Sequence, residues 1–192
     1  MKDKFTNIWG DLSKRVGVTT IQECSKDEDI YLVNSTVEAI KFDCDGNSIG
    51  KNVIDVLMLD WFNEWKKKKW HKNIPRGVDC LYVKDETLFL VEFKNQAKVD
   101  YVEIKGKIYD TLALLSFFYS LDRSEFSDIE ILIVKKFSRN EEMELIINRK
   151  TKKPRRISTH LDFLQKIYQT KITVLSPIEY EALIRDIPVG TQ

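Results

Sequence analysis

The stretch that decides the fold begins Gly77-Val78-Asp79-Cys80-Leu81-Tyr82-Val83, passes through Lys84-Asp85-Glu86-Thr87, and ends Leu88-Phe89-Leu90-Val91-Glu92-Phe93-Lys94-Asn95. Two apolar runs flank a short polar segment, which is typical of a β-hairpin. Side chains alternate between faces along a strand, and here both faces are apolar except at one end. We therefore expect a hairpin that other elements cover on both sides.

The expected register of this hairpin brings two acidic residues together. If Asp85-Glu86 forms the tip of the turn, Lys84 pairs with Thr87. Counting back along both strands then places Asp79 opposite Glu92. Directly opposed side chains have Cβ atoms roughly 5 Å apart, so two carboxylates repel each other there, and burial makes this worse. A divalent cation between them would remove the repulsion, whereas a bulge would shift the register and separate them.

Lys94 completes the predicted cluster at this end of the hairpin. It lies two residues beyond Glu92 on the same strand face, and the register places Gly77 opposite it, which is expected to leave open space. The residues alone thus predict two carboxylates and a lysine in one place. The competing interpretation is that these are strand-end charges that simply reach solvent.

The segments after the hairpin predict an α/β fold. Residues 52–69 and 101–121 have apolar residues at helical spacing, and 129–134 is a short continuous apolar run typical of a buried strand. A strand, a long helix and another strand imply a crossover, so 129–134 should run parallel to one hairpin strand. The sheet should be mixed and packed by helices. Further elements are expected at 145–148 (strand), 161–169 (helix), 172–175 (strand) and 177–184 (helix).

The N-terminal segment has two interpretations. Residues 30–33 resemble a strand, and residues 34–35 could turn it back into a second strand over 37–43. The rival interpretation starts a short helix at Ser35, with Glu38 completing a capping box.

Composition excludes several classes of protein. The chain has 192 residues, of which 43% are hydrophobic and 32% charged, so it is neither disordered nor collagen-like. Lys and Arg number 31 against 30 Asp and Glu, which argues against a uniformly basic coat protein of nucleic acid but not against local basic patches. No CxxC motif occurs, and no apolar run is long enough to cross a bilayer. We therefore expect a cytoplasmic protein without a membrane partner.

At the hairpin the sequence resembles the PD-(D/E)XK nuclease superfamily, also called restriction-endonuclease-like. The resemblance lies in Asp79, twelve intervening residues, the triplet Glu92-Phe93-Lys94, and the helix and strand that follow. It covers about residues 52–136. Val78 stands where the superfamily's name has proline, and the sequence does not identify the family's first core strand, before Asp79.

The resemblance implies a restriction-endonuclease-like core, a mixed β-sheet flanked by helices, and metal-dependent hydrolysis of phosphodiester bonds. Asp79 and Glu92 would bind Mg²⁺ or Mn²⁺ together with the carbonyl of Phe93. Lys94 would hold or activate the attacking water, or contact the scissile phosphate. The expected enzyme is a Mg²⁺-dependent deoxyribonuclease, and a role in defence, restriction or repair is an analogy.

Other residues are candidates for extending the site. Many members of the superfamily carry a Glu on the helix before the hairpin, and Glu64 is the available match, with Glu38 as a rival. Lys105 lies one step from the core face of the long helix and could reach the phosphate, or could lie on the helix flank. Asn95 and Gln96 could contact backbone phosphates, or merely end the strand.

Two basic segments are candidates for nucleic-acid contacts. One is the cluster Arg149, Lys150, Lys152, Lys153, Arg155 and Arg156, which could grip phosphates or be a solvated charged loop. The other is 66–69, flanked by Trp65 and Trp70, which could stack on bases or simply end a helix with favourable charge.

The sequence therefore predicts a single domain over residues 1–192, with a nuclease-like core at about 52–136, an N-terminal extension at 1–51 and a C-terminal appendage at 137–192. The favoured function is a metal-dependent nuclease acting on nucleic acid, with DNA preferred. One alternative is a catalytically inactive nuclease-fold module that binds nucleic acid or protein. Another is an unrelated α/β protein in which the triplet is accidental. Many relatives act as dimers, so a homodimer is compatible with the sequence.

Overall fold

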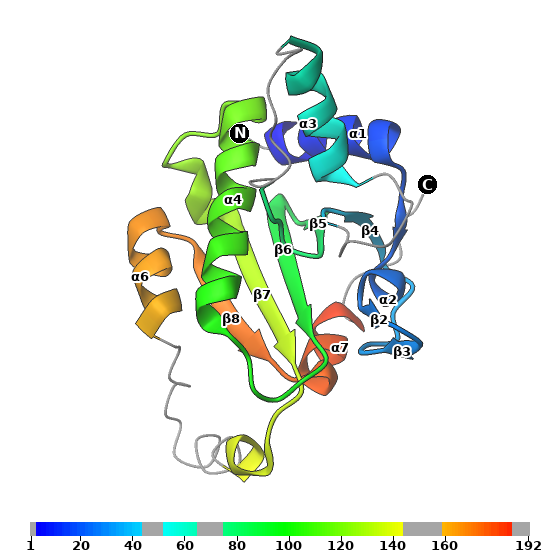
Figure 1. Cartoon of the computed structure of the whole chain (residues 1–192), viewed down its shortest axis with the longest axis vertical. Coiled ribbons are helices and arrows are strands. Elements are labelled where there is room, and N and C mark those ends of the chain that lie inside the picture. The colour runs from blue at the N-terminus through cyan, green and yellow to red at the C-terminus, as the bar shows by residue number, and fades with distance from the viewer. Residues whose placement is uncertain (1–2, 44–51, 65–74, 144–158, 186–192) are drawn as a thin grey trace.

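The computed structural model describes residues 3–43, 52–64, 75–143 and 159–185. Within these ranges six strands form one sheet in the order β1-β4-β5-β6-β7-β8 (Figure 1). The strands are β1 (Thr19–Thr20), β4 (Glu38–Lys41), β5 (Cys80–Lys84), β6 (Thr87–Lys94), β7 (Ile129–Lys135) and β8 (Lys171–Leu175). Strands β1 to β6 pair antiparallel, whereas β6, β7 and β8 are parallel to one another. The predicted mixed α/β fold is confirmed.

The hairpin of β5 and β6 has the predicted register. Lys84 pairs with Thr87, and Cys80 pairs with Val91 at the other end of the ladder. The two turn residues, Asp85-Glu86, both have positive φ, at 46° and 67°. That combination belongs to a type I′ turn, whose twist matches the twist of the strands and fixes a two-residue loop. The turn holds the register even though neither residue is glycine.

The helices are α1 (Asp3–Val16), α2 (Ile21–Cys24), α3 (Val53–Glu64), α4 (Tyr101–Tyr119), α6 (Thr159–Tyr168) and α7 (Pro177–Arg185), with a 3₁₀ turn η1 (Glu125–Asp128). α4 lies across the sheet and connects β6 to β7, so the predicted crossover is confirmed (Figure 1). It begins at Asp100, whose carboxylate accepts hydrogen bonds from the backbone N–H groups of Val102 and Glu103. It ends at Ser120 in the left-handed conformation.

Both faces of the sheet are buried, as the apolar hairpin predicts. On one face α1, α3, α4 and α6 pack against a core that includes Leu81, Leu88 and Leu90 of the hairpin. On the other face α2 and α7 cover the alternate residues, among them Cys80 and Val91. The hairpin thus lies between two hydrophobic layers. Its charged residues Asp79, Glu92 and Lys94 lie together at the end remote from the turn.

The N-terminal predictions are partly wrong. A strand at 37–43 is found as β4, so the rival short helix starting at Ser35 does not form. The strand at Ile30–Tyr31 (β3) does not pair with it, but pairs with β2 (Lys26–Asp27) in a separate hairpin. β4 instead pairs with β1 and β5, because its buried residues Ala39 and Ile40 each fill one of the two cores.

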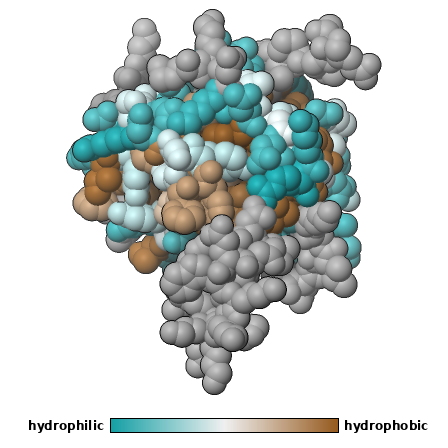
Figure 2. Space-filling view, turned by 90° about the horizontal axis from the view of Figure 1, so that it is seen from above, coloured by the Kyte–Doolittle hydropathy of each residue, from teal (hydrophilic) through white to brown (hydrophobic). Residues whose placement is uncertain are grey.

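The sequence also gave no sign of α1, whose buried residues Phe5, Ile8 and Leu12 join the larger core. Sheet strands come from before residue 52 (β1 and β4) and from after residue 136 (β8). The strand predicted at 145–148 lies outside the described residues. In the described part of the chain, no helix combines the length and apolar character needed to cross a membrane. The face seen from above shows apolar side chains in several separate patches among hydrophilic ones (Figure 2).

Candidate functional site

Asp79 and Glu92 come together at the end of the hairpin. Asp79 directly precedes β5, and the backbone N–H of Phe93 donates to its Oδ2 at 2.5 Å. The ammonium of Lys107 joins the two carboxylates, since Nζ lies 2.9 Å from Glu92 Oε1 and 3.6 Å from Asp79 Oδ1. Both acidic side chains therefore point to the same side of the sheet, towards α4. The Glu92 side chain has no exposed surface, and that of Asp79 is 18% exposed.

Lys94 lies at the solvent side of this pair. Its Nζ is 3.0 Å from Glu92 Oε1 and 3.4 Å from Glu103 Oε1 of α4. The Lys94 side chain is 16% exposed, whereas that of Lys107 is only 4% exposed. Oε1 of Glu92 thus faces two ammonium groups, one reachable from solvent and one sealed beneath α4.

The sequence did not indicate Lys107 and instead offered Lys105, two residues earlier on the same helix. The Nζ of Lys105 lies 5.0 Å from the centre of the Phe163 ring, against α6, so the structure does not bring it to the carboxylates. Lys107 falls three residues after Ile104 and four before Thr111, both of which are buried. That spacing is the one signal that could have placed Lys107 on the face of α4 that meets the sheet.

Thr111 ties this part of α4 to the residue before Asp79. Its Oγ1 accepts a hydrogen bond from the backbone N–H of Val78 at 3.0 Å and donates to the carbonyl of Lys107 at 2.8 Å. A proline at position 78 would have no N–H to donate. The N–H of Val78 therefore has a local structural use, since its bond to Thr111 holds α4 over the carboxylates.

Gly77 does not leave the open space that the sequence suggested. A Cβ atom at this position would lie 2.4 Å from Cδ1 of Phe42 and 3.0 Å from Cδ1 of Ile54. The prediction is wrong because Phe42, the residue after β4, and Ile54 of α3 close over this point, and the hairpin sequence does not reveal either contact. Gly77 instead allows the chain to enter β5 tightly packed against them.

Burial sets the direction of the pKa shift of both carboxylates in the cluster. Burial, with repulsion from Glu92, raises the pKa of Asp79 well above its ordinary value although Lys107 opposes the shift. Burial likewise raises the pKa of Glu92, against the opposing attraction of Lys107 and Lys94. For Lys94, burial lowers the pKa, but the neighbouring Glu92 carboxylate outweighs it, and the pKa is raised. The site thus disfavours the ionised form of both carboxyl groups.

One carboxylate oxygen of Glu92 lacks a hydrogen-bond donor among the described residues. Oε2 is buried and has no hydrogen-bond partner among the described residues. Buried carboxylate oxygens are almost always satisfied, and an exception calls for an explanation. A bound cation is one explanation, because Mg²⁺ is commonly held by one or two carboxylates, with water and substrate phosphate completing its shell. The two acidic residues therefore fit such an ion.

Few other described side chains near Asp79 and Glu92 could serve as metal ligands. The described residues contain no group of three or more His, Cys, Asp or Glu side chains arranged to hold a metal. The carbonyl of Phe93, which the resemblance implies as a third ligand, belongs to a residue whose backbone is held by its N–H bond to Asp79. Any ion here would depend on backbone, water or substrate oxygens for the remainder of its coordination.

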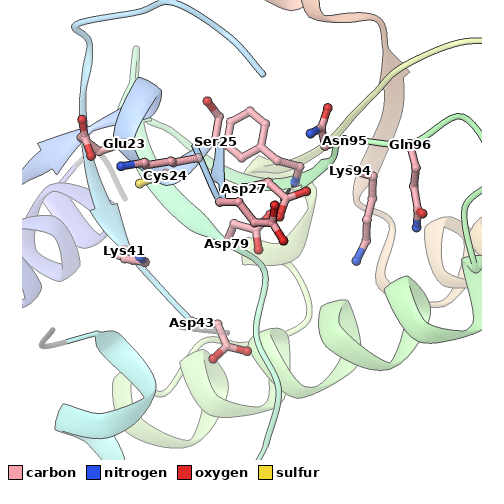
Figure 3. A pocket seen from close by; sticks show the side chains of 13 residues that line it. Glu23, Cys24, Ser25, Asp27, Lys41, Asp43, Asp79, Lys94, Asn95 and Gln96 are labelled. Atoms are coloured by element: carbon pink, nitrogen blue, oxygen red, sulfur yellow. Dashed lines mark hydrogen bonds between the residues drawn. The ribbon is translucent and has the colours of Figure 1, made fainter. Parts of the chain in front are cut away.

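A pocket of about 720 Å³ opens beside the cluster (Figure 3). Asp79 and Lys94 line it, whereas Glu92 and Lys107 do not. Its other lining residues come from the ends of β4 and β6 and from the α2–β2 region; they are Glu23, Cys24, Ser25, Lys26, Asp27, Glu28, Lys41, Asp43, Phe93, Asn95 and Gln96. A ligand in this pocket would meet one carboxylate and one lysine of the cluster directly.

The remaining predicted residues divide into two groups. Asn95 and Gln96 line the pocket, as a phosphate-contacting role requires, while Glu38 lies exposed on β4 and does not line it. The other group lies outside what the structure describes: the side chain of Glu64, the segment 66–69 with its flanking Trp residues, and the basic cluster Arg149, Lys150, Lys152, Lys153, Arg155 and Arg156.

Comparisons with known proteins add no relationship. No protein-family model matches the chain, and neither the curated proteins nor the solved structures gave a significant match.

Proposed function

We propose that this protein is a metal-dependent nuclease with a restriction-endonuclease-like core, acting on DNA in the cytoplasm. The observation that carries the proposal is the pair of the half-buried Asp79 and the fully buried Glu92, joined by Lys107 and accompanied by Lys94. Charges that merely reached solvent would not explain a glutamate whose side chain is wholly buried with one unpartnered oxygen. A fold selected for stability alone would replace it with an apolar residue.

The order of elements supports the proposed core. β4 supplies a strand before Asp79 and pairs antiparallel with β5; the sequence indicated a strand at 37–43 but did not identify it as the family's first core strand. β5 and β6 then carry Asp79, Glu92 and Lys94, and α4 returns the chain to a parallel β7. This succession matches what the resemblance to the PD-(D/E)XK superfamily implies.

The proposed cofactor is Mg²⁺ or Mn²⁺, held by Asp79, Glu92 and the carbonyl of Phe93. When bound, such an ion supplies a more acidic water and neutralises charge that develops on the phosphate. The Phe93 N–H orients the Asp79 carboxylate by holding Oδ2, which leaves Oδ1 on the Lys107 side. Glu92 is fixed from both sides by lysines.

Lys94 is the side chain best placed to act on a substrate. It is partly exposed, lines the pocket, and has a pKa raised by Glu92 despite its burial, so it is charged at neutral pH. A compact ammonium at the pocket wall would hold a water molecule or contact a phosphate oxygen. Glu103 is a second ion-pair partner of Lys94, at 3.4 Å. The ammonium group of Lys94 can therefore move away from Glu92 and still face a negative charge.

The second candidate function is a nuclease-fold module that binds nucleic acid or protein without cleaving. The observation that favours it is the internal balance of the cluster, in which two lysines already face two carboxylates. A site whose buried carboxylates already face internal cations needs no metal to persist. In either case the basic cluster at 149–156 is proposed to contact phosphates, and binding should then weaken as salt increases. A homodimer is compatible with both proposals.

A cleavage assay separates these candidates. Supercoiled plasmid, linear duplex, single-stranded DNA and RNA are incubated with the full chain in Mg²⁺, in Mn²⁺ and in excess chelator, beside the variant Glu92→Gln. The proposal expects metal-dependent nicking or degradation that the chelator and the variant both abolish. Salt-sensitive binding with no cleavage of any substrate would favour the binding module instead.

A further inference from the structure

We propose that Lys107 is an internal cation that occupies the metal position of this site and limits its affinity for divalent ions. The inference rests on the proposed function, because it concerns the same carboxylates. It assigns a role to a residue that no sequence motif indicates. Lys107 would act as a positioning residue, holding Asp79 and Glu92 in place until a metal displaces its ammonium group.

Distances support this role. The Nζ of Lys107 lies between the two carboxylates, 2.9 Å from Oε1 of Glu92 and 3.6 Å from Oδ1 of Asp79. An ion held through these two oxygens would compete with the ammonium for both contacts, so only Oε2 of Glu92 stays open to it while Lys107 remains in place. The ammonium is thus a built-in substitute for the ion.

The charge balance leads to the same conclusion. The two carboxylates and the two lysines Lys94 and Lys107 sum to zero when all are ionised, and Glu103, 3.4 Å from Lys94, brings the total to one negative charge. A divalent ion added to this cluster would leave one positive charge in excess, and repulsion between cations a few ångströms apart is strong in a buried site. A bound phosphate would offset that excess. We therefore expect metal to bind weakly alone and more tightly together with an anionic substrate.

Of the two lysines, Lys107 hinders the binding of a divalent ion more than Lys94 does. Its side chain is 4% exposed, and its carbonyl is held by Thr111. Lys94 is 16% exposed and has Glu103 as another partner, so it can move aside at smaller cost. The limit on metal affinity is therefore assigned to position 107 rather than to position 94.

The test measures Mn²⁺ binding to the full chain by isothermal titration calorimetry, without nucleic acid, for wild type, Lys107→Met and Lys105→Met. Methionine keeps the length of the buried stem and removes the charge. We expect Lys107→Met to bind Mn²⁺ about tenfold more tightly or better, because one nearby positive charge is gone. Lys105→Met, two residues away on the same helix but packed against Phe163, should match wild type.

Each outcome decides the inference. If wild type binds Mn²⁺ in a manner that Asp79→Asn abolishes, yet Lys107→Met binds no more tightly, the role of Lys107 is wrong while the proposed function stands. If neither wild type nor Lys107→Met binds Mn²⁺, the inference is overturned, and the cleavage assay decides the proposed function separately. Should Lys107→Met be unfolded without metal, Lys107→Gln is titrated beside it and thermal unfolding is followed as Mn²⁺ is added. Recovery of a folding transition supports the inference, and its absence overturns it.

Discussion

The ammonium of Lys107 lies 2.9 Å from Oε1 of Glu92, and both side chains are almost completely shielded, at 4% and 0% exposure. Ion pairs this deeply buried add little net stability compared with apolar residues of similar size, because both charges lose their hydration. Breaking one partner nevertheless costs about 3–5 kcal/mol, since a buried charge is then left alone. Retaining such a pair is therefore easier to explain by function than by stability.

Asp79→Ala should abolish any stabilisation by metal. In wild type, Mn²⁺ at about a hundred times its dissociation constant should add about 2.7 kcal/mol to the free energy of unfolding. The variant lacks one of the two carboxylates, so its melting temperature should not respond. Differential scanning calorimetry over a range of Mn²⁺ concentrations checks this. Asp162→Ala, at an exposed carboxylate on α6, is the control and should respond as wild type does.

Lys94→Met should reduce cleavage by about a hundredfold or more, the usual contribution of a group that positions or transfers a proton. Affinity for DNA should change little, because one phosphate contact among many is lost. Single-turnover cleavage rates and binding isotherms at one salt concentration measure the two effects. Lys98→Met serves as the matched control, since Lys98 is an exposed lysine of the same segment that does not line the pocket. Undiminished cleavage by Lys94→Met would refute the role of Lys94.

The stability of the metal-free protein should carry a pH dependence from the two carboxylates. The pKa of Asp79 lies above its ordinary 3.8 and that of Glu92 above its ordinary 4.5, mainly through burial. Between the ordinary and the raised values the folded state binds more protons than the unfolded chain. The free energy of unfolding contributed by these groups therefore falls as pH rises from about 4 through the raised values.

Asp79→Asn and Glu92→Gln should each flatten that slope, because an amide does not titrate. Urea unfolding across the pH range, in excess chelator, measures the difference in slope between each variant and wild type. The slope is the relevant quantity, since either substitution also leaves lysines without a counter-charge. Parallel profiles for wild type and both variants would contradict the expected shift.

Gly77→Ala should destabilise the fold by about 1–3 kcal/mol, the usual cost of overpacking. The added methyl group would lie 2.4 Å from Cδ1 of the Phe42 ring and 3.0 Å from Cδ1 of Ile54, and both distances are too short for carbon atoms that are not bonded. Gly106→Ala is the control, because nothing lies within 4 Å of its added Cβ and it sits inside α4. That substitution should stabilise the protein by about 1 kcal/mol through helix propensity. Chemical denaturation of both variants tests the pair.

The sequence determined the hairpin and its register, because a two-residue loop and strict alternation leave one pairing that buries both apolar faces. It also determined the crossover, since a long helix between two apolar strands has few ways to pack. The meeting of Asp79 with Glu92, and the position of Lys94 beside them, follow from that register. These are local consequences of spacing along one short segment.

The tertiary structure decided the rest. Lys105 and Lys107 both flank the core face of α4 in the sequence, and only the packing of that helix on the sheet turns one towards Phe163 and the other into the carboxylates. β4 joins the hairpin from far away in the chain, and with α3 it closes the space at Gly77. The physical reason is the same in each case. Periodicity fixes which side of an element faces inward, but the neighbour that it meets depends on contacts between segments remote in sequence.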